Sequence, residues 1–202
     1  MKNKFNLIIE FLQNNPELFS GKVDITTQEG IDALWLSFTE ARNKPIVLKE
    51  PTTIPDPAVS EILKAAMGYT DEQLEYIKHT HRLSMAAENK VGELLEMYLA
   101  EKLEPFGWVW CSGNFVRAID FIRKNPSDGN WYCLQVKNRN NTENSSSSRV
   151  RFGTFIFKWF RTFSTYSVRR RTNTNWGKFP YIEEGVLSEE EFLDFVNKKI
   201  KG

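Results

Sequence analysis

The chain has 202 residues, enough for one domain with a full hydrophobic core or for a core with a helical annex. Its content of 41% hydrophobic and 26% charged residues is typical of globular proteins and excludes fibrous, collagen-like and wholly disordered chains. The net charge is +1, so the total composition lacks the basic excess of many nucleic-acid-binding proteins.

The first part of the chain predicts short helices. Apolar residues at helical spacing indicate helices over 3–13 and 27–42, and four prolines within 45–57 indicate a semi-rigid connection. Two further short helices are expected over 57–68 and 70–80. The second begins with a capping box, in which Thr70 precedes Gln73 by three positions. We therefore expect a helical annex before the core.

From residue 82 the pattern changes to that of a helix followed by strands. A long amphipathic helix is predicted over 84–103, followed by strands at 108–111, 116–122 and 131–137. The turn-forming run Asn125–Asn130 separates the last two strands. The apolar run 154–163 suits a helix or a buried strand, and we favour a helix. A final helix is predicted over 189–200, after Ser188.

The charge is distributed unevenly along the chain. Residues 1–130 have a net charge of −5, residues 131–180 have +9, and residues 181–202 have −3. A strongly cationic segment between acidic ones indicates a polyanionic partner. A basic face that only contacts solvent is the alternative.

The chain shows neither a signal peptide nor a membrane-spanning segment. Its start is amphipathic, and no apolar run approaches the roughly 20 residues that a span requires. Cys111 and Cys133 lie in apolar surroundings without metal-ligand spacing, so we expect reduced, buried thiols, with a disulfide as the alternative. We expect no membrane partner and action in the cytoplasm.

Two neighbouring strands carry a set of polar residues that suits metal-dependent hydrolysis. Asp120 lies in an apolar run, and Gln135 and Lys137 alternate with Val136, so both point to one face of their strand. If the strands pair across the turn, a carboxylate, an amide oxygen and an ammonium group converge. Oxygen ligands suit Mg²⁺, and a nearby lysine assists the attack of water on a phosphodiester.

The long helix offers one more carboxylate. Gly92 and Glu96 lie four positions apart on one helical face, and the glycine is expected to let the helix approach the sheet closely. Glu88 and Glu93 are weaker alternatives on the same helix. We therefore expect Asp120, Glu96 and Gln135 to hold the metal.

This order of residues resembles the PD-(D/E)XK nuclease superfamily over about residues 84–140. The resemblance implies a catalytic set of Asp120, Gln135, Lys137 and Glu96, with Mg²⁺ as the cofactor. Two positions depart from the family pattern. Ile119 stands where a proline is usual, and Gln135 replaces the usual acidic residue, which leaves open how many metal ions bind.

A narrower resemblance extends over most of the chain. The segments 87–96, 107–113, 134–139, 140–148 and 158–162 are similar to the SinI/AvaII-type group of Type II restriction endonucleases. The resemblance implies cleavage of double-stranded DNA at GG(A/T)CC by a homodimer, in a prokaryotic host that also has a cognate DNA methyltransferase. One active site would then act on each strand.

The cationic segment supplies the residue types that bind DNA. Arginine and asparagine read base edges, and basic and hydroxyl side chains bind phosphates. The candidates are Asn138, Arg139, Asn140, Asn141, Asn144, Ser145, Arg149, Arg151, Lys158, Arg161, Arg169, Arg170 and Arg171.

These observations predict an α/β restriction-endonuclease-like core, with a central mixed sheet flanked by helices and an N-terminal helical annex. The expected division is an N-terminal helical subdomain over 1–81 and a nuclease core with DNA-binding loops over 82–202. Two other functions remain open. One is a structure-specific nuclease that resolves junctions or repairs DNA, and the other is an inactive DNA-binding module in which Gln135 marks the loss of catalysis.

Overall fold

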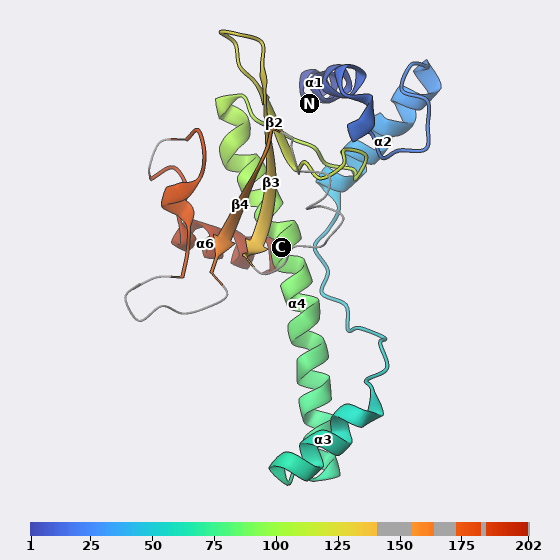
Figure 1. Ribbon diagram of the computed structural model, residues 1–202, viewed down its shortest axis with the longest axis vertical. Helices are drawn as coiled ribbons and strands as arrows, with labels where there is room; N and C mark the ends of the chain where they lie inside the picture. Colours follow the sequence, from blue (N-terminus) through green and yellow to red (C-terminus); the bar gives the residue numbers. More distant parts are fainter. Residues whose placement is uncertain (141–154, 164–172, 183–184, 202) are drawn as a thin grey trace. The chain divides into compact units, whose positions relative to one another are not determined.

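The computed structural model describes residues 1–140, 155–163, 173–182 and 185–201 (Figure 1). The chain divides into two compact units. One unit comprises Met1–Pro45 and Leu94–Gly202 and contains the sheet, and the other is Ile46–Glu93. These units divide the chain differently from the predicted boundary at residue 81, because the first 45 residues group with the sheet.

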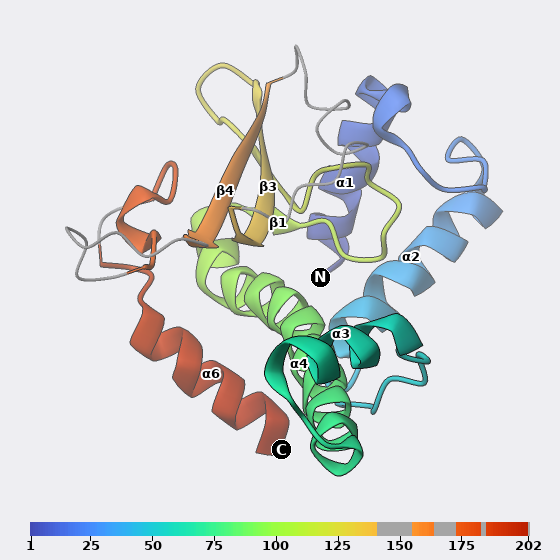
Figure 2. The ribbon, with the colours of Figure 1, turned by 60° about the horizontal axis from the view of Figure 1, so that its bottom comes forward.

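The sheet has four strands in the order β1–β2–β3–β4. They are β1 (Val109–Trp110), β2 (Phe121–Lys124), β3 (Trp131–Arg139) and β4 (Ile156–Thr162). The β1–β2 and β2–β3 pairs are antiparallel, whereas β3 and β4 are parallel and run side by side (Figure 2). The predicted mixed sheet is thus confirmed.

The helices that accompany the sheet follow the predicted order. They are α1 (Lys2–Asn14), α2 (Gln28–Asn43), α4 (Asp71–Leu103) and α6 (Glu189–Lys201), with short 3₁₀ turns at Pro16–Leu18, Glu104–Phe106 and Trp176–Lys178. The side chain of Thr27 caps α2 by accepting the N–H of Gly30 at 3.1 Å. Among the described residues, none of the helices is long and apolar enough to cross a membrane.

The N-terminal helices are part of the main core because their apolar faces pack on the sheet. Phe5, Ile8 and Phe38 are fully buried, and they share one cluster with Ile122 of β2 and Cys133 of β3. Burial of such large side chains contributes roughly 1.5–3 kcal/mol each. The cluster explains why residues 1–45 are not a separate annex.

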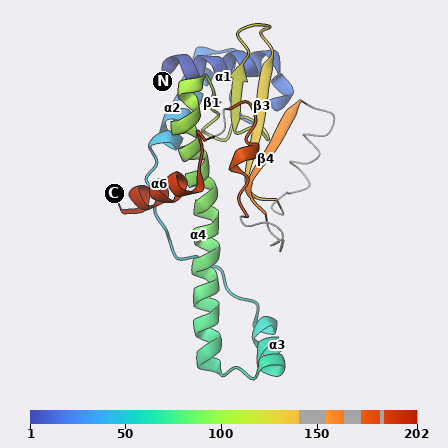
Figure 3. The same cartoon turned by 90° about the vertical axis from the view of Figure 1, so that its left-hand side faces the viewer.

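Helix α4 is one continuous helix of 33 residues where two had been predicted (Figure 3). Neither proline nor glycine occurs between Tyr69 and Val91, so no residue in that interval breaks the helix. The predicted capping box at its start is confirmed. The Thr70 N–H donates to Gln73 Oε1 at 2.9 Å, and the Gln73 N–H donates to Thr70 Oγ1 at 3.3 Å.

Residues 156–162 form a strand, so the predicted helix over 154–163 is wrong. The segment pairs in parallel with β3, with Gln135 opposite Lys158 and Val136 opposite Trp159. Apolar and polar residues do not alternate clearly in this segment, so the local pattern does not identify a strand. The strand forms by pairing with β3, which is distant in the sequence. Parallel pairing with β3 decides between the two structures that the local pattern allowed.

The strand predicted over 116–122 begins only at Phe121. Val116 makes a single bridge to Phe19, and Ala118 has a φ of 59°. Non-glycine residues rarely adopt this left-handed conformation, which turns the chain sharply. Asp120 therefore lies at the entrance of β2 rather than inside a strand.

Candidate functional site

The β2–β3 hairpin brings Asp120 next to Gln135 and Lys137, as the sequence predicts. Phe121 pairs with Leu134, and the Asp120 N–H donates to the Leu134 carbonyl at 2.9 Å. In the next step along β3, the Val136 N–H donates to Asp120 Oδ2 at 2.6 Å. The Asp120 carboxylate is thereby tied to the strand that carries the other two residues.

The environment of Asp120 disfavours its ionised form. Burial raises the pKa of Asp120 to about 6, although the Val136 N–H and the charge of Lys137 act in the opposite direction. Because Lys137 lowers this pKa, its ammonium group lies close enough to act on the carboxylate. A second cation at this carboxylate would favour ionisation further.

Gln135 is buried in the middle of β3 with an unused acceptor. Its side chain is only 3% exposed, and Oε1 has no hydrogen-bond partner in the described part of the chain. Leaving a buried amide oxygen unpaired is costly, so such an atom in a folded protein calls for an explanation. A bound cation would supply the missing partner.

Gln135 and Lys137 share one face of β3 because they are two residues apart. Lys158 of β4 is paired with Gln135, so it belongs to the same face. Lys158 is predicted from the sequence as a DNA-binding residue, and its position beside Gln135 emerges only from the structure. Strand periodicity would have revealed it if residues 154–163 had not been predicted as a helix.

Glu96, one of the candidate helix carboxylates, bonds to a residue of the sheet. It lies on α4 within the unit that contains the sheet, whereas Glu88 and Glu93 belong to Ile46–Glu93. Glu96 Oε2 accepts a hydrogen bond from Trp110 Nε1 at 2.9 Å, and Glu93 pairs with Lys90 at 2.7 Å. This bond from Trp110 is not predictable from the sequence pattern.

The reason proposed for Gly92 is wrong. A Cβ atom built at this position meets no atom within 4 Å, so close approach of the helix to the sheet does not require glycine. Leu95 and Leu99 of the same helix are fully buried, and the bond from Trp110 of β1 fixes the Glu96 side chain.

The charges of Asp120 and Glu96 both affect the buried thiol of Cys111. Burial raises the pKa of Cys111, and Cys133, Asp120 and Glu96 raise it further, against the opposing charge of Arg42. Cys111 therefore lies within electrostatic reach of both carboxylates. Both cysteines are free and buried, as expected.

The described residues contain no group of three or more His, Cys, Asp or Glu side chains that could hold a metal. This does not argue against a magnesium site at Asp120 and Gln135, because Mg²⁺ keeps several waters and takes only one or two carboxylates. The orphaned Gln135 oxygen and the buried Asp120 carboxylate are hard donors of the kind that Mg²⁺ prefers.

Five of the predicted DNA-binding residues are described. Arg161 Nε donates to Asn138 Oδ1 at 3.0 Å, and its Nη1 lies 2.5 Å from Glu189 Oε1. Its guanidinium also stacks over the ring of Phe192, 4.9 Å from the centroid. These contacts hold Arg161 between β3 and α6. The remaining described candidates are Arg139, Asn140 and Lys158. Asn141, Asn144, Ser145, Arg149, Arg151, Arg169, Arg170 and Arg171 lie outside the described residues.

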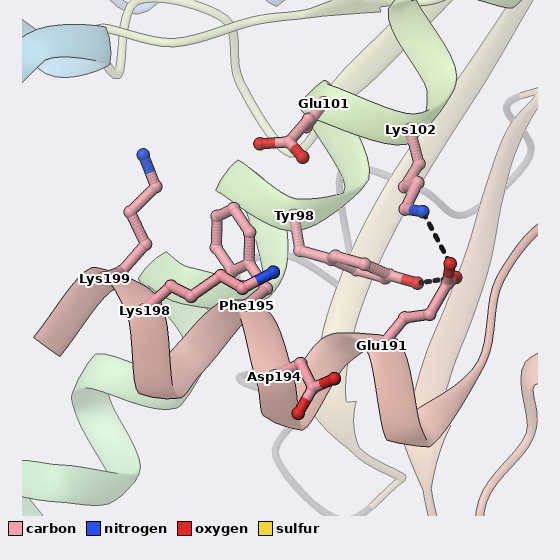
Figure 4. Close-up of a pocket in the computed structure, with 8 residues that line it drawn as sticks. All are labelled: Tyr98, Glu101, Lys102, Glu191, Asp194, Phe195, Lys198 and Lys199. Carbon is pink, nitrogen blue, oxygen red and sulfur yellow. Dashed lines mark hydrogen bonds and ion pairs between the residues drawn. The ribbon is translucent and has the colours of Figure 1, made fainter.

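A pocket of about 300 Å³ between α4 and α6 contains none of the predicted site residues. Figure 4 shows Lys102 and Tyr98 both reaching Glu191 of α6, with N–O and O–O distances of 2.9 and 3.3 Å. Burial raises the pKa of Tyr98 to about 12, so its phenol stays protonated. These bonds attach α6 to the core.

Comparison with known proteins identifies the family. The family model described as SinI restriction endonuclease matches residues 1–202. The Type II restriction enzyme Eco47I of Escherichia coli is 48% identical over 205 residues, covering 97% of this chain and 86% of the relative. The Type II restriction enzyme SinI of Salmonella infantis is 47% identical over 210 residues, covering 100% of this chain and 88% of the relative. The chain therefore belongs to the SinI restriction endonuclease family.

Proposed function

We propose that this Type II restriction endonuclease cleaves both strands of DNA at GG(A/T)CC in a Mg²⁺-dependent reaction, through a restriction-endonuclease-like PD-(D/E)XK core. Family membership supports site-specific cleavage of DNA. The observation that carries the mechanism is the buried, unpaired Gln135 oxygen beside the Asp120 carboxylate and Lys137.

In this proposal Asp120 and Gln135 hold the metal through their side-chain oxygens, and Glu96 is the additional helix carboxylate. Mg²⁺ held by these residues would supply polarisation of the scissile phosphate and a lowered pKa of water. The Val136 N–H keeps the Asp120 carboxylate in place through its bond to Oδ2. A carboxylate and an amide together carry one negative charge fewer than the usual acidic pair of the superfamily.

Lys137 assists catalysis from the same face as Gln135. Its ammonium group orients the attacking water and stabilises the negative charge that develops on the phosphoryl oxygens in the transition state. Its electrostatic effect on Asp120 supports this position next to the reacting phosphate.

The DNA duplex is contacted by residues that follow the catalytic strand. Arg139 and Asn140, directly after Lys137 and Asn138, are candidates for reading base edges, and the +9 segment 131–180 supplies phosphate contacts. The remaining candidates for the same surface are Asn141, Asn144, Ser145, Arg149, Arg151, Lys158, Arg169, Arg170 and Arg171, whereas Arg161 is engaged by Asn138 and Glu189.

Cleavage of both strands at a two-fold symmetric sequence is best achieved by a homodimer with one site per strand. We expect the enzyme to act in the cytoplasm of a bacterial host, where a cognate DNA methyltransferase would protect host sites. The free thiols of Cys111 and Cys133 suit a reducing compartment.

Digestion of a sequenced plasmid with and without Mg²⁺ tests the proposed function. We expect discrete fragments whose ends map to GG(A/T)CC, and no cleavage after chelation of the metal. Discrete fragments that end at another sequence would refute the specificity alone. Cutting only at branched or damaged DNA would indicate a structure-specific nuclease, and DNA binding without cleavage would indicate an inactive module.

A further inference from the structure

Strand β1 lies at the edge of the sheet, so among the described residues it has a strand on one side only. Its residue Trp110 pairs with Phe121, and the N–H of the next residue, Cys111, donates to the Asp120 carbonyl at 2.8 Å. Backbone groups of successive residues point to opposite sides of a strand, so the N–H and carbonyl of Trp110 point away from β2. Such outward groups need partners from elsewhere in the fold.

Arg42 of α2 and Glu104 supply these partners. Arg42 Nη2 donates to the Trp110 carbonyl at 2.8 Å and pairs with Glu104 Oε1 at 2.7 Å. The Trp110 N–H donates to the same Oε1 at 3.4 Å. Arg42 Nε also donates to Ser112 Oγ at 3.1 Å. One ion pair therefore binds both outward backbone groups of Trp110, and we call Arg42 and Glu104 the edge clamp.

The edge clamp also contacts the Trp110 side chain. Arg42 Cζ lies 5.2 Å from the centroid of the Trp110 ring and 4.3 Å from that of the Phe38 ring. A guanidinium group is attracted to the negative potential of aromatic faces. The indole N–H of the same Trp110 ring donates to Glu96 Oε2 at 2.9 Å. Arg42 thus contacts both the backbone and the ring of the residue that bonds Glu96.

The edge clamp is buried and charged. The side chains of Arg42 and Glu104 are each 11% exposed. Burial alone would raise the pKa of Glu104, but the bonds from Arg42 and Lys4 hold this pKa below its ordinary value. A buried ion pair often adds no more stability than apolar residues of similar volume. The placement of Trp110 is therefore the contribution that distinguishes this pair.

We propose that Arg42 is a positioning residue for the catalytic site, which fixes Trp110 and thereby the Glu96 carboxylate. The inference rests on the proposed function, in which Glu96 is the additional helix carboxylate at the metal. Arg42 contacts neither the metal nor the scissile phosphate in this proposal and acts through Trp110. Its loss should therefore weaken metal binding in the same way as loss of the indole N–H.

Solvent exchange of the Trp110 indole N–H tests the positioning step, measured by nuclear magnetic resonance on the full chain without metal. Trp110→Phe identifies the resonance, because this variant lacks it. Arg42→Met should speed up exchange of this N–H by about tenfold or more. Lys4→Met is the matched control, because Lys4 pairs with the other oxygen of Glu104, Oε2. It should leave the exchange rate unchanged.

Metal binding tests the consequence for the site. Arg42→Met should weaken Mn²⁺ binding, followed by electron paramagnetic resonance, by about 10- to 100-fold, and should raise the Mg²⁺ concentration for half-maximal cleavage equally. Lys4→Met should change neither quantity. Adding Arg42→Met to Trp110→Phe should weaken metal binding no further, because both changes act on the same bond to Glu96.

Arg42→Lys guards against loss of folding. It keeps a charge beside Glu104 but lacks the flat fork that also reaches Trp110 and Ser112, so it should show smaller changes in the same direction. Wild-type metal affinity in both Arg42 variants, with or without faster indole exchange, would overturn the inference, as would additive losses in the double variant. If the wild-type protein cuts no DNA but Arg42→Met speeds up exchange and weakens Mn²⁺ binding, the proposed function fails while the positioning role of Arg42 stands.

Discussion

Asp120 Oδ2 lies 2.6 Å from the backbone nitrogen of Val136, which stands between Gln135 and Lys137. This bond crosses from the entrance of β2 to β3 and keeps the Asp120 carboxylate beside the strand that carries the other two site residues. In this position the carboxylate is buried, and burial raises the pKa of Asp120 to about 6.

Asp120 should make the stability of the metal-free protein depend on pH. Its folded pKa of about 6 is above the reference value of 3.8, so between these values the folded state keeps a proton that the unfolded state has released. The free energy of unfolding should therefore fall by roughly 1–3 kcal/mol as the pH rises from about 4 to 6, and this contribution should then level off. Asp120→Asn should lack this component when denaturant unfolding is compared across pH.

The same carboxylate should control the pH dependence of cleavage. Metal binding favours the ionised form, so the apparent pKa of Asp120 should fall as the Mg²⁺ concentration rises. Cleavage of the wild-type enzyme should increase as the pH passes through that apparent pKa. A pH profile that stays in place over a wide range of Mg²⁺ concentrations would contradict a metal at Asp120.

Gln135→Glu should strengthen metal binding by restoring the carboxylate usual in the superfamily. The Mg²⁺ concentration for half-maximal cleavage should fall by about tenfold, whereas the metal-free variant should be less stable because two buried carboxylates repel each other. Gln135→Leu removes the oxygen ligand and puts an apolar side chain of similar size in its place, and it should abolish cleavage. A Gln135→Leu enzyme with normal Mg²⁺ dependence would exclude Gln135 from the metal site.

Lys137→Ala should lower the cleavage rate by about 100- to 1000-fold, because the ammonium group stabilises charge in the transition state. Affinity for cognate DNA should change little, as measured with Ca²⁺ in place of Mg²⁺. Lys124→Ala is the matched control. Lys124 is on β2 and pairs with Glu10 at the far end of the hairpin. The Lys124→Ala enzyme should therefore cleave DNA at the wild-type rate. If both variants lose the same cleavage activity, the loss is due to the change in net charge and not to the position of Lys137.

Trp110→Phe should weaken the use of Mg²⁺ by removing the indole N–H that holds Glu96. The required Mg²⁺ concentration should rise by about 10- to 100-fold, a typical effect of losing an outer-shell hydrogen bond. Trp108→Phe is the control, because Trp108 Nε1 is buried without a partner among the described residues and its loss breaks no such bond. Both variants replace a buried indole with a smaller ring. Equal shifts in the Mg²⁺ requirement of the two variants would therefore show that the bond to Glu96 does not contribute to metal binding.

The convergence of Asp120, Gln135 and Lys137 was predictable because it depends on local signals. The turn residues Asn125–Asn130 specify a hairpin, and the period of two along a strand puts Gln135 and Lys137 on one face. The structure adds the Val136 bond and the unpaired Gln135 oxygen, which depend on exact positions of atoms that no sequence pattern encodes.

The parts that sequence reasoning missed depend on contacts between distant residues. The strand Ile156–Thr162 forms beside β3, and its apolar run lacks the alternation that identifies a strand. The membership of α1 in the sheet core follows from the cluster that Phe5 and Ile8 share with Ile122, more than 100 residues away. Helical periodicity shows that one face of a helix is buried, but it does not show which element of the fold covers that face.

Arg161 should act on stability more than on DNA recognition. It bonds Asn138, pairs with Glu189 and stacks on Phe192, and its side chain is only 11% exposed. Arg161→Ala should lower the free energy of unfolding by roughly 2–3 kcal/mol, somewhat less than for a fully buried pair, because Glu189 retains contact with water. Glu189→Gln, which keeps a hydrogen-bond acceptor, should cost less. Denaturant unfolding measures both.

Arg139→Ala is the comparison that separates the two roles. Arg139 ends β3 and is exposed, so its loss should leave stability within about 0.5 kcal/mol and should reduce the preference for GG(A/T)CC over other duplexes. Binding titrations at several salt concentrations distinguish base reading from phosphate contact, because only the latter lowers the salt dependence. If Arg161→Ala folds as stably as the wild type but binds cognate DNA less selectively, Arg161 reads DNA and its contacts with Asn138 and Glu189 are secondary.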